Sequence, residues 1–335
     1  MQHLNVAVLL ATYNGSQYVQ QQINSLKDNT TAFTLHWLDD HSSDNTRDVV
    51  RSSAKTANIP LSEWHPSQRC GVPRSFFQLL ECVEADIYLF CDQDDIWSPG
   101  KIDATVADLA PGISLPVLVS SDVAQFHDDR TVTAPSVGEF VGMRKLLRAM
   151  REPPVFLMFL HALAPGASQG FTRPLRNIFL QHKAVAGGYA LMHDCWMYDI
   201  AIACGTVRLF SNTPTASHRL HRNNFTRALY GQGRNLFTRQ WQSAQSFRRL
   251  AARHAQGFVL ATPTLPPGKE VDRLFDLAQL IATVDRRQTS RELLRLARLG
   301  AMPWWGSLAA AWFSAACLCC DATPSEANLP LSAKQ

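Results

Sequence analysis

The chain lacks the cysteine pattern of a zinc-binding module. Its 335 residues include eight cysteines, but only Cys317–Cys320 has a Cys-x-x-Cys spacing, and no second pair accompanies it. No internal repeat is present, which excludes a solenoid. An apolar run begins at Val6, so we expect no signal peptide and expect reduced thiols in the cytoplasm. With 46% apolar residues, the chain can bury a large core.

Acidic residues are absent from Arg219–Lys269, which is rich in arginine and aromatic residues. The arginines are Arg219, Arg222, Arg227, Arg234, Arg239, Arg248, Arg249 and Arg253. Such a stretch suits an anionic partner: a membrane surface, a diphosphate or a nucleic acid. A solvated helix face is the structural alternative. The net charge is only +4 and no nucleic-acid module is visible, so we expect no nucleic-acid partner.

Charged residues are also absent from residues 300–320, which include Trp304, Trp305 and Trp312. The segment is rich in Ala, Gly and Ser, and it follows an arginine- and leucine-rich run at 291–299. This composition favours an interfacial helix with peripheral membrane contact over a full span. A helix docked on the rest of the protein is the alternative.

Three carboxylates in Asp92–Asp95 follow the apolar run Ile87–Cys91, which reads as a buried strand. Carboxylates this close repel one another unless a cation lies among them. A hard divalent ion, Mg²⁺ or Mn²⁺, is the expected cation, and such ions commonly neutralise the phosphates of a substrate. An acidic turn that caps the next helix is the simpler alternative.

Further apolar runs at 6–10 and 33–38 also end in polar residues, and helical patterns separate the runs. This alternation predicts an α/β fold with an open parallel sheet. Ligands of such sheets bind at the carboxyl ends of the strands. We therefore expect one crevice lined by Thr12, Asp39, Asp40, Asp92 and Asp94.

The strings Ala11–Gly15, Asp39–Asp44 and Cys91–Trp97 resemble glycosyltransferase family 2, most closely its bacterial rhamnosyltransferase-like branch, which builds cell-surface polysaccharide. Two later strings, His193–Trp196 and His218–Asn224, also resemble family strings. Any one of them is a weak signal, but five in the right order are specific.

The resemblance implies a GT-A fold, a Rossmann-like mixed sheet flanked by helices, over residues 1–225. Residues 226–335 would form a basic, mostly helical C-terminal tail. The implied reaction is an inverting transfer of rhamnose or a hexose from a nucleoside-diphosphate sugar, such as dTDP-rhamnose or a UDP-hexose. The implied acceptor is a lipid-linked saccharide at the inner face of the bacterial inner membrane.

The same resemblance assigns roles to residues. Asp194 would be the general base, and Asp92 and Asp94 the Asp-x-Asp pair, with Asp94 as the direct metal ligand. Thr12 and Tyr13 would contact the nucleotide, with Asp39 or Asp40 on the base or ribose. The metal or diphosphate would be met by His221, and the diphosphate by Arg74.

Each of these roles has a structural alternative. Asp194 could only cap the helix expected at 195–203, His221 could be solvated, and Arg74 could be a surface charge. His193 is expected to be structural. His41 replaces the family's usual Gly, so we expect a changed loop there, because His meets a steric penalty at left-handed backbone angles.

Two other readings stay open on the sequence. A related transferase could act on a soluble acceptor. Alternatively, the chain could be a catalytically inactive scaffold that binds nucleotide or glycan in a polysaccharide assembly complex.

Overall fold

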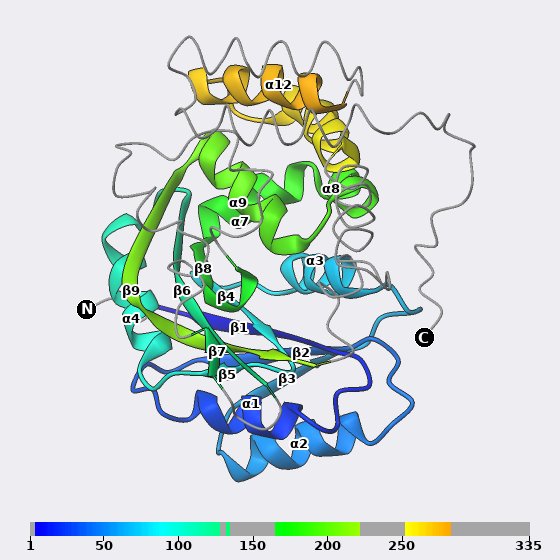
Figure 1. The fold of residues 1–335 in the computed structure, drawn as a ribbon, viewed down its shortest axis with the longest axis vertical. Coiled ribbons are helices and arrows are strands. Elements are labelled where there is room, and N and C mark those ends of the chain that lie inside the picture. Colours follow the sequence, from blue (N-terminus) through cyan, green and yellow to red (C-terminus); the bar gives the residue numbers. More distant parts are fainter. Residues whose placement is uncertain (1–3, 128–131, 135–164, 222–251, 283–335) are drawn as a thin grey trace.

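The structure, a computed structural model, describes residues 4–127, 132–134, 165–221 and 252–282. These residues form a mixed sheet of nine strands with helices on both faces (Figure 1). The α/β, GT-A-like fold class expected from the sequence is therefore confirmed. Residues 222–251, with most of the basic stretch, and the apolar segment 300–320 lie outside the described residues.

One half of the sheet is parallel, in the order β3-β2-β1-β4. Its strands are β1 (Val6–Thr12), β2 (Thr34–Asp39), β3 (Leu61–Trp64) and β4 (Ile87–Asp92). The register pairs Thr12 with Asp39 and Ala11 with Asp92. The carboxyl ends of β1, β2 and β4 therefore lie side by side.

The other half of the sheet is mixed. β8 (Gln169–Thr172) runs antiparallel between β4 and β6 (Val117–His127). β6 pairs in parallel with the long strand β9 (Thr206–Leu220), and the short strand β7 (Val132–Ala134) pairs with β6. At the edge, β5 (Ile96–Trp97) lies antiparallel to β9, which returns the chain after Asp95 to the sheet.

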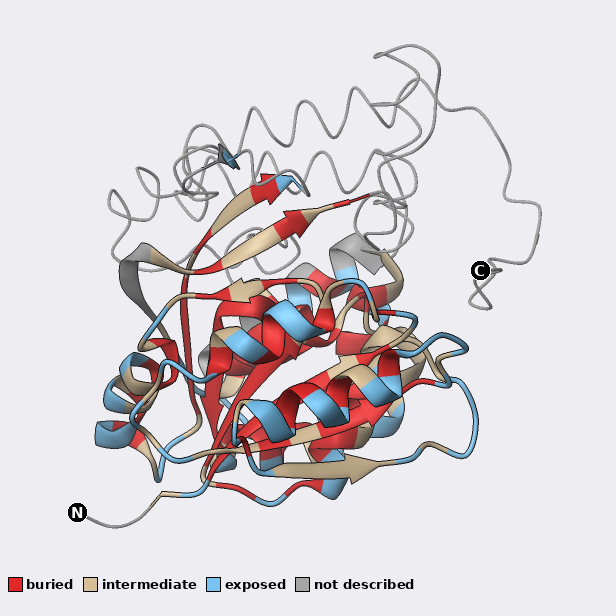
Figure 2. Cartoon of the chain, turned by 90° about the horizontal axis from the view of Figure 1, so that it is seen from below, coloured by how far each residue is buried: buried red, intermediate tan, exposed pale blue. Residues whose placement is uncertain are grey.

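Three helices pack on one face of the sheet: α1 (Val19–Leu26), α2 (Thr46–Thr56) and α4 (Lys101–Leu109). Val8 of β1 and Ile23 of α1 are among the fully buried residues of this core. Burial of each such side chain contributes roughly 1.5–3 kcal/mol. Figure 2 shows these buried faces in red, with the exposed residues on the outer sides of the helices.

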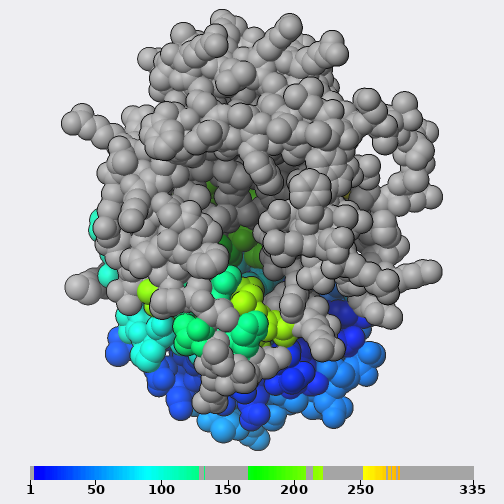
Figure 3. Space-filling model, viewed as in Figure 1, coloured from blue at the N-terminus to red at the C-terminus, as the bar shows by residue number. Residues whose placement is uncertain are grey.

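The opposite face carries α3 (Val72–Cys82), α7 (Arg173–Gln181), α8 (Lys183–Tyr189) and α9 (His193–Cys204). Helical residues 252–261 and α12 (Lys269–Ala282) join the same core, with Phe258 and Leu274 fully buried. Three short 3-10 turns complete the described elements: η1 (Ala110–Gly112), η3 (Gly166–Ser168) and η4 (Thr262–Thr264). On the face seen in Figure 3, the N-terminal residues, in blue, form the lower part of the molecule.

The loop after β2 contains a non-glycine residue in the left-handed region. His41 has a φ of 64°, and its ring Nε2 lies 3.1 Å from the carbonyl oxygen of Pro66. His41 thus adopts a left-handed backbone conformation, which the glycine usual at this position in the family would adopt without steric cost. The loop keeps a left-handed residue at this position, with a ring contact to the chain that follows β3.

Candidate functional site

The carboxyl ends of β1, β2 and β4 bring Thr12, Asp39 and Asp92 to one edge of the sheet. The loops that follow these strands add Tyr13, Asp40 and Asp94. The side chains therefore converge because parallel strands end at the same edge, which is where open α/β sheets bind ligands.

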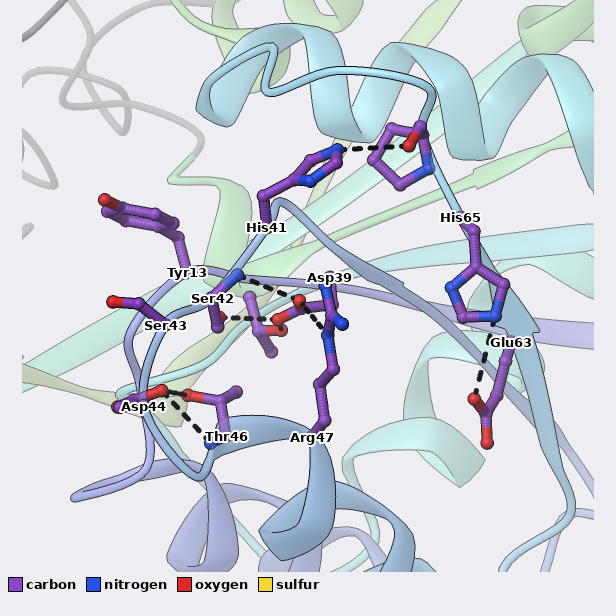
Figure 4. Close-up of polar contacts among 12 residues, drawn as sticks. Tyr13, Asp39, His41, Ser42, Ser43, Asp44, Thr46, Arg47, Glu63 and His65 are labelled. Atoms are coloured by element: carbon purple, nitrogen blue, oxygen red, sulfur yellow. Dashed lines mark hydrogen bonds and ion pairs between the residues drawn. The ribbon is translucent and has the colours of Figure 1, made fainter.

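Both carboxylate oxygens of Asp39 accept hydrogen bonds from surrounding residues (Figure 4). It accepts hydrogen bonds from Thr12 Oγ1 at 3.0 Å, from Ser42 N at 3.0 Å and from Arg47 Nε at 2.7 Å. Burial alone would raise the pKa of Asp39, but the bonds from Ser42 and Arg47 outweigh it and lower that pKa. Asp39 is thus an ionised anchor of the loop between β2 and α2.

Asp40 anchors a different loop. Its two oxygens accept hydrogen bonds from Cys70 N at 2.8 Å and Gly71 N at 2.9 Å, at the start of α3. The neighbouring Arg69 has its guanidinium 3.7 Å from the centroid of the Tyr13 ring, a cation–π contact. Asp40 therefore fixes the loop that places a cation over Tyr13.

The β1 and β4 loops are joined by Gln93, a residue for which no role was predicted from the sequence. Tyr13 N donates to Gln93 Oε1 at 2.9 Å, and Gln93 Nε2 donates back to the Tyr13 carbonyl at 3.1 Å. A Cβ at Gly15 would lie 2.1 Å from Gln93 Oε1. Glycine at this position therefore leaves room for the amide that joins the two loops.

Within the acidic cluster, the three aspartates of the β4 loop have different surroundings. Asp94 Oδ2 lies 2.7 Å from His221 Nε2, so the structure brings together two residues expected near the metal. Burial and the charges of Asp95, Asp94 and Asp194 raise the pKa of Asp92 well above its ordinary value. A cation among these groups would relieve the repulsion.

Asp95 is fully buried, and it organises the end of β9. Its Oδ1 accepts from His218 Nδ1 at 3.0 Å and from Arg219 N at 3.2 Å. Burial would lower the pKa of His218, but the charge and hydrogen bond of Asp95 raise it to about 9. The pair holds the strand that carries His221 beside Asp94, a role that the sequence did not reveal.

We expect the protein to lose stability as pH rises from 6.5 to about 9, because His218 then loses its proton. Because the pKa of His218 is higher in the folded state than its ordinary 6.5, the charged His218 stabilises the fold. This stabilisation is fully present below pH 6.5 and is lost as the pH rises through about 9. His218→Gln should therefore lower the free energy of unfolding by on the order of 2 kcal/mol at low pH and by much less at high pH. Urea denaturation of wild type and His218→Gln across this pH range measures the loss in the free energy of unfolding at both ends.

The exposed His65 provides the control: its side chain is 65% exposed, and its Nε2 lies 4.0 Å from Glu63 Oε2. His65→Gln should leave the pH profile unchanged. A wild-type minus His218→Gln difference that is the same at both ends of the range would contradict the role given to the charged pair.

Asp194 lies in the first turn of α9, whose N-cap is Met192. Its Oδ2 accepts from Gly166 N at 2.9 Å, and its Oδ1 accepts from Cys195 N at 2.9 Å. The helix begins at His193 rather than at 195, so Asp194 is not its N-cap residue. The ring of His193, the residue before Asp194, lies 4.5 Å from that of Phe90 on β4, two residues before Asp92, so the start of α9 lies beside the end of β4.

Three other expected residues have clear surroundings. His193 is buried, with its ring stacked on Phe76 at a centroid distance of 3.9 Å, as a structural histidine would be. Arg74 Nε donates to the Gly187 carbonyl at 2.9 Å and so ties α3 to α8. Arg219 is buried against Tyr18 and Phe126.

The donor set suits a hard divalent ion that shares its coordination with a substrate. Within residues 4–127, 132–134, 165–221 and 252–282, no group of three or more His, Cys, Asp or Glu side chains is arranged to hold a metal by itself. Mg²⁺ usually takes only one or two protein carboxylates and completes its shell with phosphate oxygens and water. Asp92 and Asp94 fit that pattern, and the pKa of Asp92 is raised first by burial and then by the neighbouring carboxylates.

The mixed sheet, with polar and acidic residues at its strand ends, is that of a GT-A-like fold. Residues 7–129 match the family described as "Glycosyl transferase family 2".

Two relatives show the extent of the sequence similarity. A 227-residue stretch, 64% of this chain and 72% of the relative, is 25% identical to "dTDP-rhamnosyl transferase RfbG" of Shigella flexneri. A 136-residue stretch, 40% of this chain and 42% of the relative, is 24% identical to "Uncharacterized glycosyltransferase alr2836" of Nostoc sp..

Two solved structures share the fold. S. aureus TarS 1-349 in complex with UDP-GlcNAc has a TM-score of 0.51 and 12% identity, over 89% of this chain and 92% of TarS. The mannosyltransferase PcManGT from Pyrobaculum calidifontis, in complex with GDP-Man and Mn²⁺, has a TM-score of 0.50 and 14% identity, over 95% and 86%. At these identities the likeness establishes the fold alone.

Proposed function

We propose that the chain is a metal-dependent, inverting glycosyltransferase that moves rhamnose or another hexose from a nucleoside-diphosphate sugar to a lipid-linked or surface-polysaccharide glycan. The observation that carries this proposal is the meeting of two acidic groups in one site. His193, next to Asp194 at the start of α9, packs against Phe90 of β4, two residues before Asp92, with 4.5 Å between the ring centroids. Burial and the charges of Asp95, Asp94 and Asp194 together raise the pKa of Asp92. The β4 carboxylates suit a metal ion and the diphosphate, and the Asp194 carboxylate suits an acceptor hydroxyl.

The donor side consists of the strand-end residues. Asp92 and Asp94 would hold Mg²⁺ or Mn²⁺, with His221 orienting Asp94 or meeting the ion itself. When bound, such an ion stabilises the charge that develops on the departing diphosphate. Thr12 and Tyr13 would contact the nucleotide, and Asp39 and Asp40 would shape its pocket through the loops that they anchor.

The acceptor side centres on Asp194. A carboxylate there would take the proton of the acceptor hydroxyl as that oxygen attacks the anomeric carbon. Attack from the face opposite the diphosphate inverts the configuration at that carbon. Arg74 is proposed at the diphosphate, which would require its Nε to leave the Gly187 carbonyl.

Rhamnose is the favoured sugar because the relative named dTDP-rhamnosyl transferase RfbG aligns with 64% of this chain. We place the reaction at the cytoplasmic face of a bacterial inner membrane, with residues 1–225 catalytic and 226–335 providing membrane contact through the segment at 300–320. None of the helices in the described part of the chain is long and apolar enough to cross a membrane. The charge balance supports no nucleic-acid partner.

A thermal-shift screen tests the donor. We expect one nucleotide sugar among dTDP-rhamnose, UDP-GlcNAc, UDP-glucose and GDP-mannose to raise the melting temperature in Mn²⁺, because a ligand that binds only the folded state stabilises it. Ligand at 100 times its Kd adds about 2.7 kcal/mol. The same donor in EDTA is the control, and its shift should be much smaller.

Release of the nucleoside diphosphate separates an enzyme from an inactive scaffold. An enzyme supplied with the stabilising donor and a lipid-linked acceptor releases the diphosphate, whereas a scaffold binds the donor and releases none. Equal release with a soluble saccharide would favour the transferase with a soluble acceptor. A screen in which no donor shifts the melting temperature would contradict the proposed function.

A further inference from the structure

A lysine is buried beside the proposed site. Lys101, the first residue of α4, is 1% exposed, and Gly100 precedes it in the left-handed region with a φ of 73°. An ammonium group removed from water costs free energy unless nearby groups compensate for the lost hydration. Lys101 therefore needs partners, and they identify what it does.

The Lys101 ammonium has two direct partners. Its Nζ donates a hydrogen bond to the Ala167 carbonyl, and it lies 3.4 Å from the centroid of the Trp97 ring. Burial lowers the pKa of Lys101 to about 7, while the charges of Cys91, Asp95 and Asp92 act in the opposite direction. The ammonium thus lies between the acidic strand end of β4 and the turn η3.

The turn η3 (Gly166–Ser168) connects Lys101 to Asp194. The carbonyl oxygen of its middle residue, Ala167, accepts the hydrogen bond from Lys101 Nζ. The backbone N–H of its first residue, Gly166, donates to Asp194 Oδ2 at 2.9 Å. The third residue, Ser168, has its Oγ 2.7 Å from Ser120 Oγ on β6. Within three residues, a buried cation is therefore linked to the proposed base.

Glycine at position 166 lets the turn lie close against the start of α9. A Cβ added to Gly166 would lie 3.2 Å from Asp194 Cβ and 3.3 Å from Asp194 Oδ2. Because Gly166 N donates directly to Asp194 Oδ2, a shift of the turn would break that hydrogen bond or displace the carboxylate.

We propose that Lys101 is a positioning residue: it fixes the Gly166–Ser168 turn and thereby holds the Asp194 carboxylate at a set place relative to Asp92. This role rests on the proposed function, in which Asp194 accepts the acceptor's proton. Lys101 touches neither substrate nor proton. Its effect on the reaction is indirect: proton transfer requires the Asp194 carboxylate within hydrogen-bond reach of the acceptor hydroxyl, and Lys101 keeps the carboxylate in position.

Lys101→Met tests the proposal, since it keeps the length and apolar body of the side chain but removes the donor and the charge. We expect kcat for sugar transfer to fall about 10²-fold, the scale reported for small misplacements of catalytic groups. The Kd values for donor and Mn²⁺ should not rise, because the metal-side carboxylates stay in place and lose a neighbouring cation. Weaker Mn²⁺ binding would contradict the proposal.

A double substitution distinguishes positioning from a general structural effect. In an Asp194→Asn background, Lys101→Met should lower kcat no more than about twofold further, because the group that it positions is already disabled. If the two losses multiply instead, Lys101 acts independently of Asp194 and the proposal is wrong.

Leu109→Ala provides the matched control, because Leu109 is a fully buried residue at the other end of α4. This variant should unfold more easily than wild type but keep its kcat well below its melting temperature. If Lys101→Met does not fold, Lys101→Gln replaces it, alone and combined with Asp194→Asn. The same two measurements then decide: kcat with the Kd for Mn²⁺ in the single variant, and the further loss of kcat in the double variant. Wild type without transferase activity, or Asp194→Asn with full activity, would instead overturn the proposed function.

Discussion

Asp194→Asn is expected to lower the rate of sugar transfer by about 10³-fold while leaving donor binding intact. General-base catalysis contributes typically 10²–10⁴-fold, and an amide cannot take the acceptor's proton. Asn has the shape of Asp, and its carbonyl oxygen can still accept one of the bonds that Gly166 N and Cys195 N donate to Asp194. The measurement is steady-state transfer with the donor identified by thermal shift, together with the Kd of that donor.

Asp86→Asn provides the control for this change. Asp86 directly precedes β4, at the opposite end of that strand from the site, where it pairs with Arg173 at 2.6 Å. Its replacement should leave both kcat and donor Kd near the wild-type values. Transfer by Asp194→Asn at more than about a tenth of the wild-type rate would rule out Asp194 as the base.

Asp94→Asn is expected to lower the rate of sugar transfer by about as much as Asp194→Asn, but by weakening metal binding rather than proton transfer. It removes one negative charge from the site that would hold the ion, and it weakens the contact of 2.7 Å with His221. We expect transfer to fall about 10³-fold and the Mn²⁺ concentration for half-maximal rate to rise at least about tenfold, since a lost metal ligand lowers both affinity and charge stabilisation. Activity measured against Mn²⁺ concentration separates the two effects.

Metal removal from the wild type gives the matching comparison. EDTA should abolish transfer, and excess Mn²⁺ or Mg²⁺ should restore it, whereas Asp94→Asn should recover only in part. An Asp94→Asn variant with the wild-type Mn²⁺ dependence would show that Asp94 is not a metal ligand.

The sequence predicted three of the four strands in the parallel half of the sheet, all but β3, because the signals of those three are local. Apolar runs at 6–10, 33–38 and 87–91 match β1, β2 and β4, and each run is followed by polar residues. The topology of parallel strands alone then predicts that Asp39 and Asp92 lie at the same edge of the sheet. The GT-A expectation likewise needed only short strings in the right order.

The pairings within the other half of the sheet and the supporting contacts could not be predicted, because they join residues far apart in the chain. β5 is two residues long and exists through its pairing with β9, more than a hundred residues later. The partner of Lys101 lies 66 residues away, and that of Asp95 lies 123 residues away. No local pattern distinguishes Asp95, a buried anchor, from Asp94, a proposed ligand.

Asp39 illustrates a subtler limit. The sequence placed it correctly at the end of β2 and predicted a contact with the nucleotide. In the structure, Thr12, Ser42 and Arg47 already occupy its oxygens. Its contribution to binding therefore includes the shape of the β2–α2 loop, which depends on hydrogen-bond partners that the spacing of residues cannot show.

The most direct test of the metal site is a calorimetric titration of the stabilising nucleotide sugar into wild type and into Asp94→Asn, each with Mn²⁺ and with EDTA. A divalent ion between the β4 carboxylates and the diphosphate predicts tight binding only for wild type with Mn²⁺, and a Kd at least about tenfold weaker in the other three titrations. The same Kd in all four titrations would contradict that site.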